Sequence, residues 1–126
     1  MSKILIVDDS GFSRNMTKRA LAGLGHEVLT ANDGVSGLAA IESEQPDCVI
    51  LDLLMPVLDG FGVLEVLQTQ GDAAPPVVVV SADIQESTRE RVLSLGAIQI
   101  LNKPASKDQL LKVIGEMLSG NGQEAA

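Results

Sequence analysis

Aromatic side chains are nearly missing from this sequence of 126 residues, which contains two Phe and neither Trp nor Tyr. So few rings offer no platform on which nucleic-acid bases could stack, and little support for a flavin or a sugar. Basic residues are also few, because nine Lys and Arg stand against seventeen Asp and Glu, for a net charge of -8. A phosphate backbone attracts a basic protein face, so direct binding to nucleic acid is not expected. Any chemistry must rest on charged groups and on the backbone.

Cysteine and long apolar runs are lacking as well. The single Cys48 lies in an apolar stretch, where we expect a buried and reduced thiol, and one cysteine cannot form an internal disulfide. No run approaches the ~18 apolar residues that cross a bilayer, and Asp8 comes too early for a secretory signal. These absences predict a soluble cytoplasmic protein without membrane insertion.

Apolar residues make up 45% of the chain, which is enough to fill the core of one domain without disulfides. Short runs rich in Val, Ile and Leu alternate with stretches whose apolar residues recur at helical spacing. The predicted strands are residues 3–7, 26–31, 47–52, 77–80 and 98–101, and the predicted helices are residues 13–24, 35–45, 60–70, 84–95 and 106–118. The inward stripe of the second helix is expected to consist of Val35, Leu38, Ala39 and Ile41.

Alternating strands and helices predict an α/β domain with a parallel five-stranded sheet, doubly wound and covered by helices on both faces. In such folds ligands bind beyond the carboxyl ends of the strands, beside the point where the strand order reverses. We expect residues 1–119 to form this domain, and the small, polar residues 120–126 to form a flexible tail.

Five polar residues stand at the predicted strand ends: Asp8 and Asp9, Asp52, Ser81 and Lys103. All these ends lie on one edge of a parallel sheet, where three carboxylates would repel one another unless a hard cation such as Mg²⁺ joined them. A carboxylate that faces Mg²⁺ and an ammonium group is arranged to attack a phosphoryl group. We therefore interpret Asp52 as the phosphoacceptor. Lys103 would neutralise the phosphoryl group, and the Ser81 hydroxyl would bind it and report its presence.

Four segments carry a family resemblance, and they stand in the order Ile-Val-Asp-Asp-Ser, Leu-Asp-Leu-Leu-Met-Pro-Val-Leu-Asp-Gly, Val-Val-Val-Val-Ser-Ala-Asp and Leu-Asn-Lys-Pro. Over about residues 3–118 the sequence resembles the receiver domains of bacterial response regulators. The resemblance implies a flavodoxin-like fold with strand order 2-1-3-4-5, of the stand-alone, chemotaxis-type kind. It also implies that the peptide bond before Pro104 is cis.

By the same resemblance, Ser81 and Lys103 bind the phosphoryl group. The implied Mg²⁺ ligands are Asp8, Asp9, Asp52 and the backbone carbonyl of Leu54. The phosphoryl group would come to Asp52 from a histidine kinase, a phosphotransfer domain or a small phosphodonor. Such a protein is a signalling switch and not an enzyme, because it catalyses only its own phosphorylation and the slow loss of the phosphoryl group.

Partners are implied in kind and not by name. In receivers the first helix helps to dock the kinase or phosphotransfer domain, and a basic patch there could steer an acidic partner. Arg14, Lys18 and Arg19 are otherwise interpreted as a solvated face of that helix. The downstream target is unknown, the signal is expected to pass by protein contact, and we expect a monomer or a weak dimer.

The sequence departs from the family pattern around the predicted site. Ile100 stands where receivers commonly carry Tyr or Phe, so an aromatic ring cannot move inward on activation and the readout must differ. Leu54 and Asp83 each lie two residues after a site residue. Apolar Leu54 should hinder the approach of water, while Asp83 would either orient that water or repel it.

Other functions are open to the same residues. Each one taken singly has an ordinary structural explanation as a turn, a helix cap or a solvated surface group, and only the joint occurrence favours a site. A phosphohydrolase with an aspartyl-phosphate intermediate needs a second Asp at the position of Leu54. A flavin-binding domain would be disfavoured by the carboxylates of Asp8 and Asp9. A receiver-like adaptor that works without phosphorylation is the remaining alternative.

Overall fold

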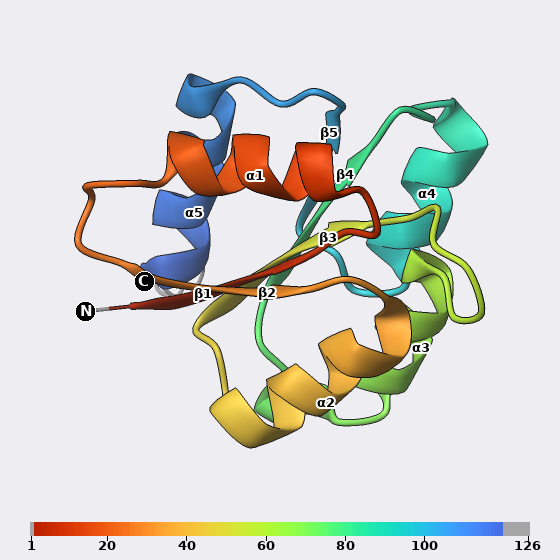
Figure 1. The fold of residues 1–126 in the computed structure, drawn as a ribbon. Coiled ribbons are helices and arrows are strands. Elements are labelled where there is room, and N and C mark those ends of the chain that lie inside the picture. Colours follow the sequence, from red (N-terminus) through yellow and green to blue (C-terminus); the bar gives the residue numbers. More distant parts are fainter. Residues whose placement is uncertain (1, 120–126) are drawn as a thin grey trace.

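Five parallel strands form one sheet in the order β2-β1-β3-β4-β5 in the computed structural model, which describes residues 2–119. The strands are β1 (Lys3–Val7), β2 (Glu27–Ala31), β3 (Cys48–Asp52), β4 (Val77–Ser81) and β5 (Gln99–Asn102). The helices are α1 (Gly11–Ala20), α2 (Gly34–Glu44), α3 (Gly60–Gln68), α4 (Glu86–Ser94) and α5 (Lys107–Leu118), with a short 3-10 helix η1 (Gly71–Ala73). Figure 1 shows α1 and α5 above the sheet and α2 and α3 below it. The predicted fold class and strand order are confirmed, while the predicted tail lies outside the described residues.

Each face of the sheet has its own core, because successive strand residues point to opposite faces. In β1, Ile4 and Ile6 pack toward α1 and α5, whereas Leu5 and Val7 pack toward α2, α3 and α4. Cys48 is fully buried in the first of these cores, as predicted, and burial raises the pKa of its thiol to about 12. A thiol of that kind is inert at neutral pH.

The predicted boundaries of α1 and α4 are wrong. α1 begins at Gly11, not at residue 13, because the Ser10 side chain caps it by accepting a hydrogen bond from the backbone N–H of Ser13 at 3.2 Å. It ends at Ala20, so Leu24, which was assigned to the helix, lies beyond it and is exposed. α4 begins at Glu86, and Ile84 stays on the preceding loop. The Ser10 cap sets the start of α1, whereas α4 begins without a side-chain cap, and the apolar periodicity reports neither start.

The predicted inward stripe of α2 is also only partly right. The buried residues of this helix are Gly34, Gly37 and Ile41, while Val35 is 58% exposed. A Cβ at Gly37 would lie 2.8 Å from Cγ1 of Val7, so the glycine lets the helix approach the sheet closely. Two glycines therefore face the core with Ile41, Leu38 packs against that core while partly buried, as predicted, and Val35 and Ala39 are exposed.

Glycine also holds the segment between β3 and α3 in a tight path. The backbone N–H of Gly60 donates to the carbonyl oxygen of Leu53 at 2.9 Å, and a Cβ at Gly60 would lie 2.8 Å from the Cα of Leu53. The chain after Asp52 is thus folded back against the end of β3, which fixes the direction of that strand end. Within residues 2–119, no helix combines the length and the apolar character that a membrane crossing requires.

Candidate functional site

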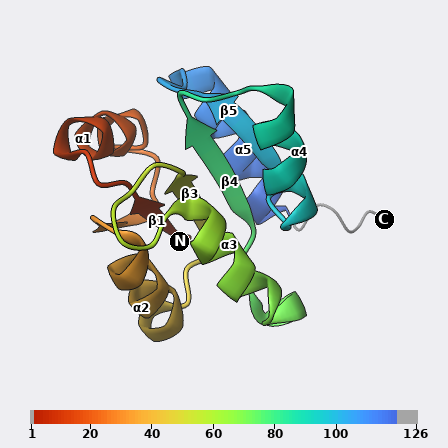
Figure 2. The same ribbon diagram turned by 90° about the vertical axis from the view of Figure 1, so that its right-hand side faces the viewer.

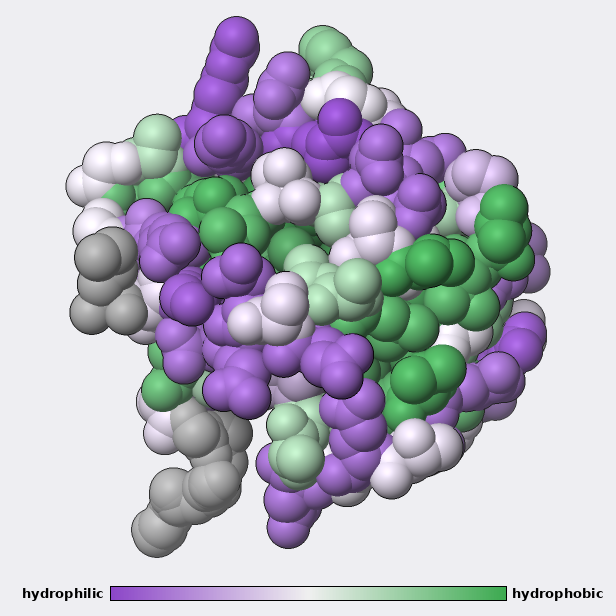
Figure 3. Space-filling view, turned by 60° about the horizontal axis from the view of Figure 1, so that its bottom comes forward, coloured by the Kyte–Doolittle hydropathy of each residue, from purple (hydrophilic) through white to green (hydrophobic). Residues whose placement is uncertain are grey.

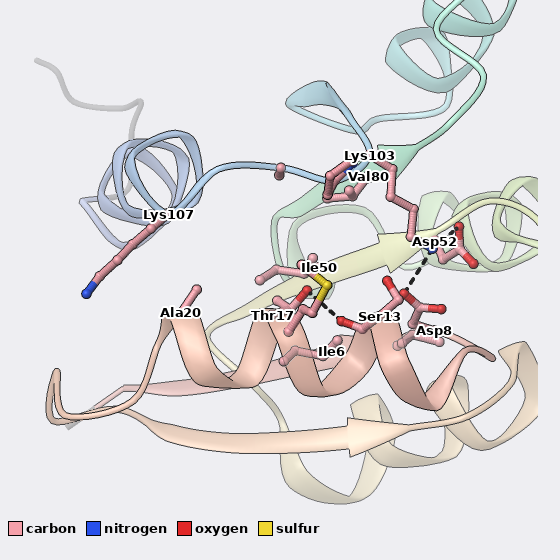
Figure 4. Close-up of a pocket in the computed structure, with 14 residues that line it drawn as sticks. Ile6, Asp8, Ser13, Thr17, Ala20, Ile50, Asp52, Val80, Lys103 and Lys107 are labelled. Carbon is pink, nitrogen blue, oxygen red and sulfur yellow. Dashed lines mark hydrogen bonds and ion pairs between the residues drawn. The ribbon is translucent and has the colours of Figure 1, made fainter.

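The predicted site residues meet at one edge of the sheet. Asp8 follows β1, Asp52 ends β3, Ser81 ends β4 and Lys103 follows β5. Figure 2 turns the edge at which β1 and β3 end toward the viewer, and Figure 4 shows Asp8, Asp52 and Lys103 pointing toward one another. Asp8, Asp52 and Ser81 are 5%, 6% and 1% exposed, whereas Asp9 is exposed. Parallel strands therefore bring together residues that lie far apart in the sequence.

Lys103 supplies a positive charge at the centre of this cluster. Its Nζ lies 3.1 Å from Oδ2 of Asp8 and 3.5 Å from Oδ1 of Asp52. Its backbone N–H donates to the carbonyl oxygen of Ser81 at 2.9 Å, and the peptide bond between Lys103 and Pro104 is cis, as the resemblance implied. The ammonium group is mostly shielded from water, so the charges interact strongly.

The carboxylates form a site for a hard cation. One oxygen from each of Asp8, Asp9 and Asp52 lies within 4.8 Å of the other two. The pKa of Asp52 is raised to about 6, mainly by burial and also by the charges of Asp8 and Asp9, while Lys103 opposes this shift. One lysine leaves negative charge in excess, and Mg²⁺ prefers oxygen donors of this kind in a partly open site. The residues therefore fit Mg²⁺, while coordination by the Leu54 carbonyl stays a prediction.

Two residues that sequence reasoning missed hold Asp8 in place. The backbone N–H of Ser10 donates to Oδ1 of Asp8 at 2.9 Å, and Nη1 of Arg14 donates to the carbonyl oxygen of Asp8 at 2.8 Å. Arg14 is thus not simply part of a solvated face, which corrects that interpretation. The Asp-x-Ser pattern at a helix start was a usable signal for Ser10. The contact from Arg14 depends on how α1 is placed over the turn.

Ser81 is linked to α4 by a chain of hydrogen bonds. Its Oγ accepts a hydrogen bond from the backbone N–H of Asp83 at 3.0 Å. Within residues 2–119, the Ser81 hydroxyl itself donates no hydrogen bond. The Asp83 carboxylate accepts from Oγ1 of Thr88 at 2.8 Å and from the N–H of Gln85 at 3.1 Å. The Ser81 proton is therefore free to be donated to a phosphoryl oxygen. Thr88, which is buried in α4, carried no signal in the sequence.

Ile100 lies on β5 in the core between the sheet and α4, in register with Val79. It is 6% exposed, so its side chain already fills the space beside Val92. Its part in activation stays a prediction. Leu54, by contrast, is 68% exposed on the loop that follows Asp52.

A pocket of about 200 Å³ opens from this cluster between α1 and the start of α5. Asp52 and Lys103 lie at one end, and Met16, Thr17 and Ala105 line the walls (Figure 4). Ala105 stands where receivers often carry Phe after Lys-Pro, so its small side chain leaves this space open.

Comparisons with known proteins agree with this geometry. A sequence model of the response regulator receiver domain matches residues 4–115. The chain is 37% identical over 121 residues to the protein PilH of Pseudomonas aeruginosa. That match covers 95% of this chain and 100% of PilH. It is 38% identical over 126 residues to the response regulator MprA of Mycobacterium bovis, but that match covers 98% of this chain and only 54% of MprA. The chain therefore spans about half the length of such larger relatives.

Among solved structures, the chemotaxis protein CheY4 of Vibrio cholerae superposes with a TM-score of 0.85 at 32% sequence identity. The superposition covers 94% of this chain and 99% of that chain. The similarity thus extends through the whole sheet and its helices. The residues matched by the family model include all five predicted site residues: Asp8, Asp9, Asp52, Ser81 and Lys103. The chain belongs to the receiver domain family of two-component response regulators, which act in phosphorylation-dependent signalling.

Proposed function

We propose that Asp52 is the residue that takes the phosphoryl group, and that Mg²⁺ bound by Asp8, Asp9 and Asp52 is required. The observation that carries this proposal is the buried Asp52 carboxylate, 3.5 Å from the Lys103 ammonium group and next to two further carboxylates. Bound Mg²⁺ would neutralise charge on the transferring phosphoryl oxygens. Burying these charged side chains costs free energy, so a purely structural role for the cluster is disfavoured.

The reaction is a displacement at phosphorus. An oxygen of the ionised Asp52 carboxylate forms a bond to phosphorus, the bond to the donor nitrogen or oxygen breaks, and the donor leaves with that electron pair. Lys103 stabilises the negative charge on the phosphoryl oxygens, and the Ser81 hydroxyl donates a hydrogen bond to one of them. The product is an acyl phosphate on Asp52, with the Ser81 hydroxyl held against it.

The proposed donors are a histidine kinase, a histidine phosphotransfer domain or a small phosphodonor. The signal would pass by contact with a downstream protein through the one domain of residues 1–119. We place this activity in the cytoplasm, where Cys48 would remain reduced. No separate substrate is turned over in this scheme, because Leu54 provides no second carboxylate that could activate water.

Intact mass spectrometry after incubation with acetyl phosphate and Mg²⁺ tests the proposal. We expect one phosphoryl group on the native chain, none on Asp52→Asn and none when a chelator removes the metal. Asp72→Asn, an equally conservative change at an exposed position on η1, is the control and should be phosphorylated normally. An adduct that survives either Asp52→Asn or the chelator contradicts the assignment. No adduct under any condition favours the phosphorylation-independent adaptor.

The lifetime of the phosphoryl group should depend on Leu54. This side chain is 68% exposed two residues after Asp52, where its apolar surface hinders water. Leu54→Asn is expected to speed dephosphorylation roughly 3- to 10-fold, because an amide can hold the attacking water. The decay of the phosphorylated protein after removal of the donor measures this. Val35→Asn, at another exposed aliphatic residue, should leave the decay unchanged, and an equal decay in native protein and Leu54→Asn would contradict the role.

A further inference from the structure

A groove runs between α2 and α3, on the side of the molecule away from α1. It has a volume of about 840 Å³, and its apolar lining includes Leu38, Ile41 and Val66. Pro46 and Pro75, which precede β3 and β4, lie at its end. The groove therefore lies toward the amino ends of the strands, at the opposite edge of the sheet from Asp52.

The groove belongs to a wider apolar surface. Val66 is 40% exposed, and Val35 and Val57 are 58% and 98% exposed toward the other end of the two helices. Figure 3 brings this side forward and shows an apolar area bordered by hydrophilic residues. Because Gly34 and Gly37 take the inward positions of α2, apolar side chains of that helix remain at the surface. Exposed apolar area of this kind marks interaction sites.

Val57 adds to this apolar surface from the loop between β3 and α3. Its φ is 69°, in the left-handed region that a β-branched residue rarely adopts, and the turn is closed by the backbone N–H of Leu58, which donates to the carbonyl oxygen of Pro56 at 2.8 Å. Its side chain is almost completely exposed, so it contributes apolar area to the surface.

Charge identifies the kind of partner that this surface fits. Residues 20–88 contain eleven Asp and Glu and no Lys or Arg, so all nine basic residues lie elsewhere in the chain. Glu42 lines the groove together with Gln45 and Gln70, and within residues 2–119 it makes no ion pair. The groove thus combines an apolar lining with one acidic side chain that has no ion pair within the described residues, whereas Glu44 of α2 and Glu65 of α3 are paired with Lys3 and Arg91.

We propose that the α2–α3 groove binds a cationic amphipathic helix of a partner protein, independently of phosphorylation. The apolar face of such a helix would cover Val66 and Leu38, and a basic side chain beside that face would pair with Glu42. A second copy of this chain is disfavoured as the occupant, because each copy has a net charge of -8. The groove would then hold the protein near its partner whether or not Asp52 carries a phosphoryl group.

Nuclear magnetic resonance titration of the full 126-residue chain tests this, with a synthetic amphipathic helical peptide of Leu and Lys as the probe. We expect saturable shifts concentrated in α2 and α3, and no such shifts with a peptide in which every Lys is Glu. Glu42→Lys and Val66→Gln should each weaken binding roughly 5- to 10-fold. Glu116→Lys, the same charge change on the exposed face of α5, should bind as the native chain does. Thermal unfolding of each variant checks that it is folded.

Equal binding by Glu42→Lys and Glu116→Lys, or shifts centred on other surfaces, would overturn the proposal, because the peptide would then follow overall acidity alone. Concentration-dependent shifts of the same residues without peptide would overturn it in favour of a second copy in the groove. Asp52→Asn should bind the peptide with unchanged affinity. The docking proposal can therefore fail while phosphorylation of Asp52 stands, and the reverse also holds.

Discussion

Replacing Lys103 with Met is expected to slow phosphorylation of Asp52 by acetyl phosphate about 100- to 1000-fold, because a charge-stabilising donor in a shielded site contributes a factor of this size. In the native chain the Lys103 ammonium group lies between Asp8 and Asp52, at 3.1 and 3.5 Å. Met keeps much of the length and the apolar stem but removes the charge. The rate of adduct formation, followed by intact mass at saturating Mg²⁺, measures the effect.

Lys112→Met is the matched control for this change, because Lys112 is exposed on α5 and lies outside the acidic cluster. It should be phosphorylated at the native rate. A Lys103→Met rate within about threefold of the native rate would mean that the ammonium group does not stabilise the transferring phosphoryl group. Its role would then be limited to balancing the carboxylates of the unphosphorylated protein.

The fold was largely predictable because its three central strands, β1, β3 and β4, are buried on both faces. The four consecutive Val residues of β4 favour a strand over a helix, and all of them are buried. Once five parallel strands are given, the positions of Asp8, Asp52 and Ser81 at strand ends place them on one edge. The site could therefore be assembled from the sequence without any knowledge of distances.

What the sequence could not show depends on close contacts between elements. The inward face of α2 is set by Gly37 against Val7, and a periodicity that counts apolar residues assigns that face to larger side chains. Likewise, Arg14 and Thr88 reach Asp8 and Asp83 only because α1 and α4 lie at particular angles over the strand ends. Side-chain hydrogen bonds of this kind follow the tertiary structure and have no repeating pattern along the chain.

Asp52 should make the metal-free protein less stable as the pH rises, and this is the second large effect that we expect. The pKa of Asp52 in the folded protein is raised to about 6, against an ordinary value of 3.8. Between these two values the folded state binds more protons than the unfolded state, so the free energy of unfolding falls as pH increases through the window. The full difference corresponds to at most about 3 kcal/mol, and it is complete above about pH 7.

Asp52→Asn removes this titration, so in the presence of a chelator it should be more stable than the native chain by about 1–3 kcal/mol at pH 7 and by little at pH 4. Urea unfolding of both proteins across this range measures the contribution of Asp52 together with its coupling to the neighbouring carboxylates, because the two chains differ only at this residue. Mg²⁺ should stabilise the native chain more than Asp52→Asn, since it binds the carboxylate that destabilises the metal-free fold. A difference that does not change with pH, or a less stable Asp52→Asn, would contradict the buried repulsion among Asp8, Asp9 and Asp52. The charge cluster would then be stabilised by Lys103 alone, and the fold would carry no electrostatic cost that a metal ion could relieve.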